Sequence, residues 1–295
     1  MGIIAVLTVI AIVLSSLYLP AYFREWGDFY TSFEYAQMYL NDDRYDELII
    51  EYSYVQGFPP SDFARETLLS TIEEICHKDS VVETKNEMIP QRPGRNRYDR
   101  DGVEDMLEEY RGNERGEGTM VLYVLYLDGE WSDKPNVLGL SFGGQNIVIF
   151  KHTIITVTQR SPNLDVEVVE SSVLVHEFGH ILGLVGIGYD SEHEDKEHKH
   201  HCDESQGSCV MSYTVEIRVG EDSEPPPLEF CTLCMDDLEL IRTLEDGRGI
   251  EEHLTFMVVA SQGAIGLIWI AVCLGKKKQD YEHYHQYYDD YEKDQ

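Results

Sequence analysis

The sequence predicts an α+β fold in which helices back a mixed β-sheet, flanked by two transmembrane helices. Three observations lead to this prediction. Strand-like runs alternate with helical patterns between residues 45 and 150, and a long helical pattern with two histidines follows at 165–184. The segments 1–23 and 254–275 carry no charged side chain. Strands that alternate with amphipathic helices are typical of a sheet covered by helices.

The first elements of the domain follow from residue type and spacing. The run 45–55 is rich in Ile, Tyr and Val, which predicts a strand, and Phe58-Pro59-Pro60 ends it. Apolar residues at helical spacing predict a helix at 61–77. There follow a predicted strand at 81–89, a loop at 90–96 and a helix at 99–110.

The centre of the sheet is predicted at 119–127, where a nearly continuous apolar run is typical of a buried strand. Two short strands at 137–141 and 146–150 surround a turn at Gly143-Gly144. The last long helix is expected at 165–184. This order predicts a sheet that ends next to a helix carrying the most polar motif of the chain.

The charge of the chain excludes some partners. Its 295 residues carry a formal charge of −32, from 55 acidic and 23 basic residues. A surface of this sign repels nucleic acid and anionic lipid headgroups. We therefore expect no nucleic-acid partner.

The N-terminal segment 1–23 is long enough to span a bilayer. It is either a retained anchor or a cleaved signal peptide. No Lys or Arg precedes the apolar run and no good small-x-small cleavage site follows it, so the composition favours an anchor.

The segment 254–275 predicts a transmembrane helix, and Lys276-Lys277-Lys278 follows it at once. The positive-inside rule places these lysines in the cytoplasm. Two spans then put the domain 24–253 outside the cytoplasm, and leave 276–295 as a short cytoplasmic tail. This tail is acidic and rich in Tyr, without apolar periodicity, and is expected to be disordered.

The most informative motif runs from His176 to Gly183 and reads H-E-x-x-H-x-x-G. On a helix, His176 and His180 lie on one face and can share a metal ion. Glu177 can then take a proton from a water bound to that metal. Gly183 can end the helix in a left-handed turn.

A catalytic zinc usually has three protein ligands. The position six residues after His180, where the compact form of this motif has its third histidine, is Gly186. The loop 191–202 supplies four histidines instead. Such an insertion is physically acceptable, because each doubling of loop length costs only about 0.6 kcal/mol. The alternative is a solvated polar loop that binds metal weakly.

Four segments together resemble the archaemetzincin branch of the metzincin zinc peptidases. They are His176 to Gly183, His201-Cys202, Cys209-Val210-Met211 and Cys231-Thr232-Leu233-Cys234. The family pattern is H-E-x-x-H-x-x-G-x-x-H-C, then C-x-M, then C-x-x-C, and the match covers roughly residues 119–240. The insertion before His201, the longer spacing from Cys202 to Cys209 and the membrane segments depart from that pattern.

The resemblance implies roles for individual residues. His201 is the third zinc ligand, with His193 as the runner-up. Met211 lies in a methionine turn beneath the metal, and the hydroxyl of Tyr213 reaches the metal or the developing oxyanion. A second, structural zinc is held by four cysteines: Cys202, Cys209, Cys231 and Cys234.

Disulfides remain an alternative for these four cysteines outside the cytoplasm. Cys76, on a predicted helix, and Cys273, in a membrane segment, are interpreted as small buried residues.

We therefore expect a membrane-anchored zinc metallopeptidase of zincin fold. Its peptide or protein substrate would add as an antiparallel strand to an exposed edge at 137–141. Two other interpretations stay open. The domain is a metal-binding or protein-binding ectodomain without catalysis, or the histidine-rich loop is a metal sensor or scavenger that does not depend on His176.

Overall fold

The structure is a computed structural model that describes residues 32–243, except 42, 85–86, 92–93, 95–96, 114–115, 162, 187–188, 204, 206 and 218–224. The predicted membrane segments, the tail 276–295 and Cys273 lie outside these residues. None of the helices within the described ranges is both long and apolar enough to cross a membrane.

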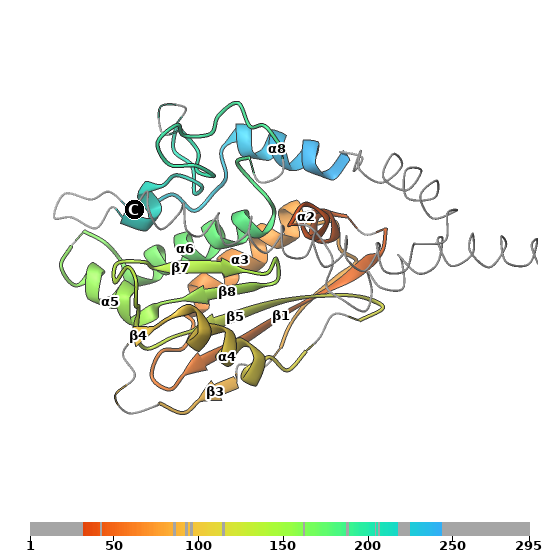
Figure 1. The fold of residues 1–295 in the computed structure, drawn as a ribbon. Helices are drawn as coiled ribbons and strands as arrows, with labels where there is room; N and C mark the ends of the chain where they lie inside the picture. Colours follow the sequence, from red (N-terminus) through yellow and green to blue (C-terminus); the bar gives the residue numbers. More distant parts are fainter. Residues whose placement is uncertain are drawn as a thin grey trace, which may run out of the picture. The chain divides into compact units, whose positions relative to one another are not determined.

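A mixed sheet forms the centre of the fold (Figure 1). The strand order is β2-β1-β5-β8-β7, and β3 also pairs with β1. All pairs are parallel except β7 with β8. The strands are β1 (Tyr45–Val55), β2 (Ser80–Glu83), β3 (Glu87–Ile89), β5 (Gly118–Tyr126), β7 (Gly139–Phe142) and β8 (Asn146–Ile149). A separate parallel pair joins β4 (Arg97–Tyr98) to β6 (Glu130–Trp131).

The strands predicted at 45–55, 119–127, 137–141 and 146–150 are confirmed. The single strand predicted at 81–89 is wrong, because β2 and β3 are separate strands on the same edge of β1. Glu83 pairs with Ile50 and Glu87 pairs with Ser53. The partner chain therefore advances one residue more than β1 between these pairs, which interrupts the ladder.

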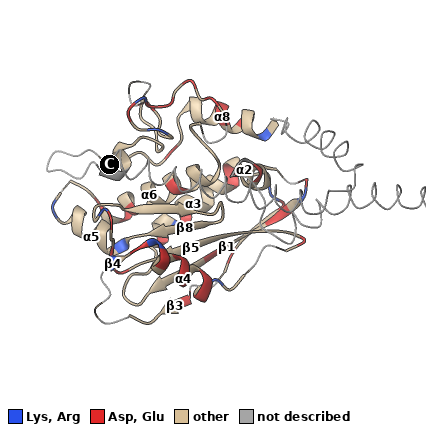
Figure 2. Ribbon diagram, viewed as in Figure 1, with Lys and Arg blue, Asp and Glu red and all other residues tan. Residues whose placement is uncertain are grey.

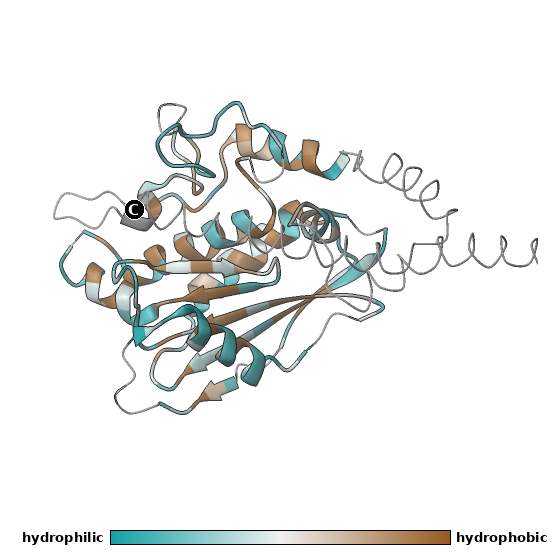
Figure 3. Cartoon of the chain, viewed as in Figure 1, coloured by the Kyte–Doolittle hydropathy of each residue, from teal (hydrophilic) through white to brown (hydrophobic). Residues whose placement is uncertain are grey.

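β5 is the core of the sheet, as its apolar sequence predicts. It lies between β1 and β8, and Met120 to Tyr126 are fully buried. In Figure 3 the hydrophobic colour is continuous along much of β5 and β8. Because both faces of β5 are covered, it lies at the centre of the fold. β8 pairs with β5 and β7 pairs with β8, so both strands lie in the sheet beneath α6.

The helices are α2 (Ser32–Leu40), α3 (Asp62–Ile75), α4 (Arg100–Tyr110), α5 (Lys151–Thr158), α6 (Val166–Ile181), α7 (Thr214–Ile217) and α8 (Thr232–Thr243). The predicted helices at 61–77, 99–110 and 165–184 are confirmed as α3, α4 and α6. Ser61, Asp99 and Asp165 cap their N-termini by accepting hydrogen bonds from backbone N–H groups. The motif helix is not the last one, because α8 follows it.

α3 and α4 lie on opposite sides of the sheet (Figure 1). α3 connects β1 to β2 at one edge, whereas α4 leads back past β1 to β5. Right-handed crossovers in opposite directions put their helices on opposite faces. α6 packs beside α3 and over β7 and β8, so the motif helix lies across one end of the sheet.

A buried ion pair fixes α6 against its neighbours. Lys151, at the start of α5, pairs with Glu170 on α6, and both side chains are at most 9% exposed. Glu170 also accepts a hydrogen bond from Ser61 N at 3.0 Å. Because removing one partner of a buried pair leaves an uncompensated charge, this contact resists displacement of the helix.

Candidate metal centre

α6 places the motif residues in a buried position. Asp165 caps its start, accepting from Glu167 N at 2.8 Å and Val168 N at 3.3 Å. Its end agrees with the prediction for Gly183, which has a φ of 73° in the left-handed region. The helix is therefore defined at both ends, and one turn separates His176 from His180.

Three histidines converge at this helix. The Nε2 atoms of His176 and His180 are 3.0 Å apart, and the His201 ring centroid is 5.3 Å from each of theirs. One ligand atom from each ring lies within 4.8 Å of the others, and none of the three residues is more than 5% exposed. Tetrahedral zinc with Zn–N of about 2.0–2.1 Å needs nitrogens about 3.4 Å apart, so these donors fit a zinc ion after small shifts.

Backbone carbonyls orient two of the rings. His176 Nδ1 donates to Val210 O at 2.7 Å, and His201 Nδ1 donates to Lys199 O at 2.8 Å. A ring that donates from Nδ1 keeps the lone pair of Nε2 for a metal. Val210 belongs to the predicted methionine turn, so that turn helps to orient the first histidine of the motif.

The insertion reaches the metal centre as a small hairpin. Glu194 pairs with Cys202 in an antiparallel bridge, and Asp195 N donates to His201 O at 2.7 Å. His200, next to the bridge, has a φ of 63°, and its N–H donates to the Glu194 carboxylate at 2.8 Å. This turn brings His201 to His176 and His180.

Gly186, which occupies the usual position of the third ligand, lies under the same hairpin. Its φ is 86°, and a Cβ at this position would be 3.3 Å from the Glu194 carboxyl group. The chain turns away here and returns fifteen residues later with His201.

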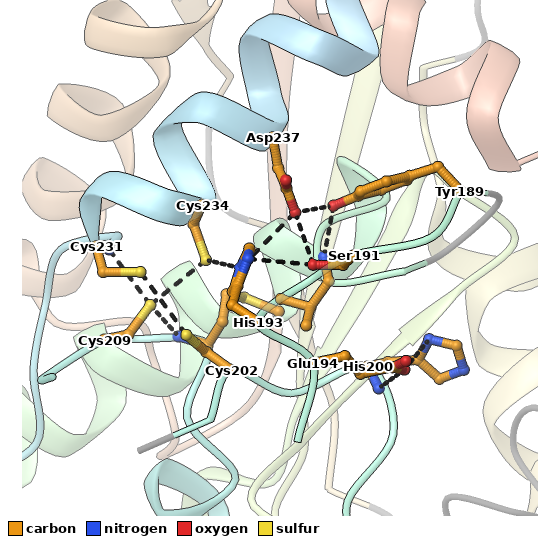
Figure 4. A network of polar contacts seen from close by, with 12 residues as sticks. Tyr189, Ser191, His193, Glu194, His200, Cys202, Cys209, Cys231, Cys234 and Asp237 are labelled. Atoms are coloured by element: carbon orange, nitrogen blue, oxygen red, sulfur yellow. Dashed lines mark hydrogen bonds and ion pairs between the residues drawn. The ribbon is translucent and has the colours of Figure 1, made fainter. Parts of the chain in front are cut away.

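His193 lies elsewhere. Its Nε2 is 3.4 Å from the Cys234 sulfur, and its Nδ1 is 3.1 Å from Ser191 Oγ. Figure 4 shows the ring beside the cysteine cluster. The geometry therefore pairs His201, and not His193, with the motif histidines.

The four clustered cysteines meet as free thiols. Their sulfurs all lie within 4.8 Å, with Cys202 to Cys231 at 3.7 Å and Cys209 to Cys234 at 3.6 Å (Figure 4). A disulfide needs about 2.05 Å, whereas tetrahedral zinc with Zn–S of about 2.3 Å gives sulfurs about 3.8 Å apart. The observed spacing fits a metal ion.

Cys76 is separate from this cluster. It follows α3, is 4% exposed, and burial raises the pKa of its thiol to about 12. Cys76 is therefore confirmed as a small buried residue.

The methionine turn connects the two clusters. Met211 O accepts from Cys202 N at 2.8 Å, while Met211 N and Cys231 N donate to the Cys209 sulfur at 3.4 and 3.3 Å. Met211 itself is fully buried beneath α6. The cysteine cluster is therefore connected to two of the three histidines, because Val210 next to Cys209 orients His176 and Cys202 directly follows His201.

Gly179 allows this close packing. A Cβ at this position would overlap the Met211 sulfur and lie 3.0 Å from Phe230 Cε1. We expect Gly179→Ala to lower the free energy of unfolding by about 1–3 kcal/mol because of overpacking, although alanine is the better helix former. Thermal unfolding of the purified chain would measure this loss.

Gly116→Ala is the matched control, since nothing lies within 4 Å of its Cβ position. A Gly179→Ala chain as stable as this control would contradict the packing of Met211 against α6.

Glu177 lies against the end strand of the sheet. A Cβ built on Gly139 of β7 would be 2.9 Å from Glu177 Cγ and 3.0 Å from Oε1. The glycine therefore leaves room for the carboxylate beside β7. Sequence reasoning missed this role of Gly139, because the contact joins residues 38 positions apart.

The prediction of an exposed edge at 137–141 needs correction. β7 is the end strand, but Leu140, Ser141 and Phe142 are only 3–5% exposed. α6 covers one face, and Trp131 covers Phe142 with ring centroids 6.4 Å apart. These exposed fractions refer to whole residues, so the backbone of β7 is covered together with its side chains.

Tyr213 lies next to the third histidine. Its ring centroid is 5.3 Å from that of His201, and it stacks on His198 at 3.7 Å with an interplanar angle of 14°. The tyrosine is 7% exposed. Tyr213 therefore lies beside one of the three histidines, and the insertion supplies His198, which stacks on it.

Acidic residues are spread over the fold, as the composition predicts. Figure 2 shows them on α4, on β1 and in the loop that follows α6. Burial lowers the pKa of His200, while nearby Glu194 raises it and partly offsets this effect.

No protein-family model matches the chain, and no curated protein sequence matches it. Among solved structures, it is similar to the crystal structure of archaemetzincin from Methanopyrus kandleri, with 17% sequence identity and a TM-score of 0.42. The similarity covers 67% of this chain and 95% of that chain.

Proposed function

We propose that this chain is a zinc-dependent metallopeptidase of the zincin type. The observation that carries the proposal is the convergence of three buried histidines within 4.8 Å, with a carboxylate on the same helix beside the end strand. In this proposal His176, His180 and His201 hold the ion. Glu177 is the general base.

The loop histidines do not support a separate metal scavenger. His193 contacts Cys234, His198 stacks on Tyr213, and His201 joins the motif histidines. Each of these three histidines contacts a different residue outside the loop, so they do not form a metal site of their own.

In the proposed reaction, a zinc ion held by His176, His180 and His201 would polarise the scissile carbonyl and lower the pKa of a water. Glu177 takes the proton from the attacking water and returns it to the leaving amine. The space above Gly139 lets the Glu177 carboxylate lie beside β7. The substrate in this proposal is a peptide or a protein.

His201→Ala separates the third ligand from its runner-up. We expect this variant to lose one zinc per chain, because its Nε2 is one of three donors, whereas His193→Ala keeps that zinc. Elemental mass spectrometry of the purified chains would measure the zinc content. Full zinc retention by the His201→Ala chain would rule out the three-histidine site.

Tyr213 is proposed to stabilise the developing oxyanion. Its ring lies beside His201, so its hydroxyl is a candidate donor near the reacting carbonyl. We expect Tyr213→Phe to lower kcat by about 100-fold with little change in KM, the effect of losing a transition-state donor. Steady-state peptide cleavage would measure both constants. Unchanged turnover would remove this role.

A second, structural zinc is proposed at the four cysteines. The support is their sulfur spacing of 3.6–3.7 Å and the N–H groups that donate to Cys209. Thiolate ligands in a closed tetrahedral site are typical of structural zinc.

Anchoring in a membrane is also proposed, with the domain outside the cytoplasm. It rests on the uncharged segments 1–23 and 254–275. The two ends of the described domain also lie together: Gln37 on α2 donates to Ile241 O at 2.9 Å, and Arg242 on α8 donates to Leu40 O at 2.7 Å. Adjacent ends are compatible with a domain between two spans of one bilayer. Release of the chain from membranes by alkaline carbonate would contradict anchoring.

A further inference from the structure

The insertion carries a polar network that the resemblance does not imply (Figure 4). Val185 N, just after the motif helix, donates to the Tyr189 hydroxyl at 3.0 Å. Tyr189 donates in turn to Asp237 on α8, and Ser191 Oγ lies 3.1 Å from the same carboxylate oxygen. Burial, followed by the Asp237 hydrogen bond, raises the pKa of Tyr189, which keeps its hydroxyl protonated as a donor.

His193 continues this network to the cysteines. The ring is 5% exposed and lies between Ser191 Oγ, 3.1 Å from Nδ1, and the Cys234 sulfur, 3.4 Å from Nε2. Asp237 Oδ2 is 3.7 Å from the same Nε2. The ring is therefore held from both sides, and one of its nitrogens faces a proposed zinc ligand.

We propose that His193 is a positioning residue of the four-cysteine site, donating a hydrogen bond from Nε2 to the Cys234 sulfur. The inference rests on the proposed structural zinc. A zinc-bound thiolate carries no proton, so the hydrogen of this contact comes from the ring. The Ser191 hydroxyl then donates to Nδ1, and Asp237 Oδ2 lies 3.7 Å from Nε2, so both residues fix the ring in place.

This contact has a physical purpose. Four thiolates around one zinc leave a net negative charge in a buried place, and an N–H donor reduces the charge on the sulfur. The same contact ties the insertion to α8. The insertion thereby serves both clusters, since it brings His201 to one and His193 to the other.

Cobalt substitution of the full-length chain in detergent provides the test. Sulfur-to-cobalt charge-transfer absorption reports the cysteine cluster alone, because the three-histidine site has no sulfur ligand. We would follow the loss of this absorption after a chelator is added. His193→Phe, which keeps a ring but has no donor, is expected to lose cobalt at least about 10-fold faster than the unmodified chain.

Two further variants sharpen the test. His193→Gln keeps an N–H donor and is expected to restore much of the slow release and to shift the charge-transfer band less than His193→Phe. His77→Phe changes an exposed histidine and is expected to have no effect. If His193→Phe does not fold, Ser191→Ala carries the test, because it removes the link from Nδ1 to Asp237 without altering the ring.

The outcomes separate the proposals. Equal release rates for the unmodified, His193→Phe and Ser191→Ala chains would overturn the role of His193 and leave the structural metal in place. No charge-transfer absorption in the unmodified chain would overturn the structural metal and this inference together. The peptidase proposal would stand or fall separately, on the zinc bound by His176, His180 and His201.

Discussion

Replacing Glu177 with glutamine is expected to lower kcat/KM for peptide hydrolysis by about 1,000-fold, with the zinc content unchanged. The amide cannot accept a proton from the attacking water, and general-base catalysis contributes about 10²–10⁴-fold. Glutamine has nearly the same shape, so its packing beside Gly139 is retained. Cleavage of a mixed peptide library, followed by mass spectrometry, measures the rate without a known substrate.

Glu167→Gln is the matched control. Glu167 lies in the first turn of the same helix and is exposed, away from the histidines. We expect its activity to equal that of the unmodified chain. Undiminished cleavage by the Glu177→Gln chain would remove this residue from the mechanism. A metal-loaded but inactive unmodified chain would instead favour an ectodomain without catalysis.

Cys209→Ser is expected to remove one zinc per chain and to lower Tm by at least about 10 °C. Structural zinc contributes on the order of 10 kcal/mol to folding, and even half of this corresponds to about 10–20 °C at about 2–4 °C per kcal/mol. Cys209 is fully buried and accepts two backbone N–H bonds, which the shorter serine side chain cannot reproduce. Calorimetry and zinc analysis measure the two effects.

Cys76→Ser provides the comparison, because Cys76 is a buried thiol outside the cluster. We expect it to keep both zinc ions and to lose much less stability. If the Cys209→Ser chain matched it in zinc content and Tm, the four cysteines would not hold a structural metal.

The same substitution is expected to reduce peptidase activity, even though Cys209 is not at the histidine site. The residues after it form the connection: Val210 O accepts from His176, and Met211 O accepts from Cys202, which follows His201. Loss of the cluster therefore displaces a carbonyl that orients one ligand and a strand bridge that delivers another. Orienting groups of this kind commonly change metal affinity by about 10–100-fold.

Local patterns made much of the fold predictable. β5 was predictable because a buried strand reads as an unbroken apolar run, and α6 because Asp165 and Gly183 mark its ends. α2, α5, α7 and α8 were missed, and so were the short strands β4 and β6. α5 is only eight residues long and contains β-branched residues that also suit a strand, and the C-x-x-C spacing in α8 drew attention to metal binding instead of helix formation.

By itself, the sequence predicted that His176 and His180 share one helix face with Glu177 beside them, because helix period is a local property. The set of four cysteines was implied by the resemblance to the archaemetzincin pattern. Only the tertiary structure decided which loop histidine joins the pair. Glu194 accepts a hydrogen bond from His200 N and pairs with Cys202, and these two contacts turn His201 toward the motif histidines. Ser191 and Asp237 hold His193 beside the cysteines. These contacts join residues distant in the chain, and a loop has no period from which its side-chain directions could be predicted.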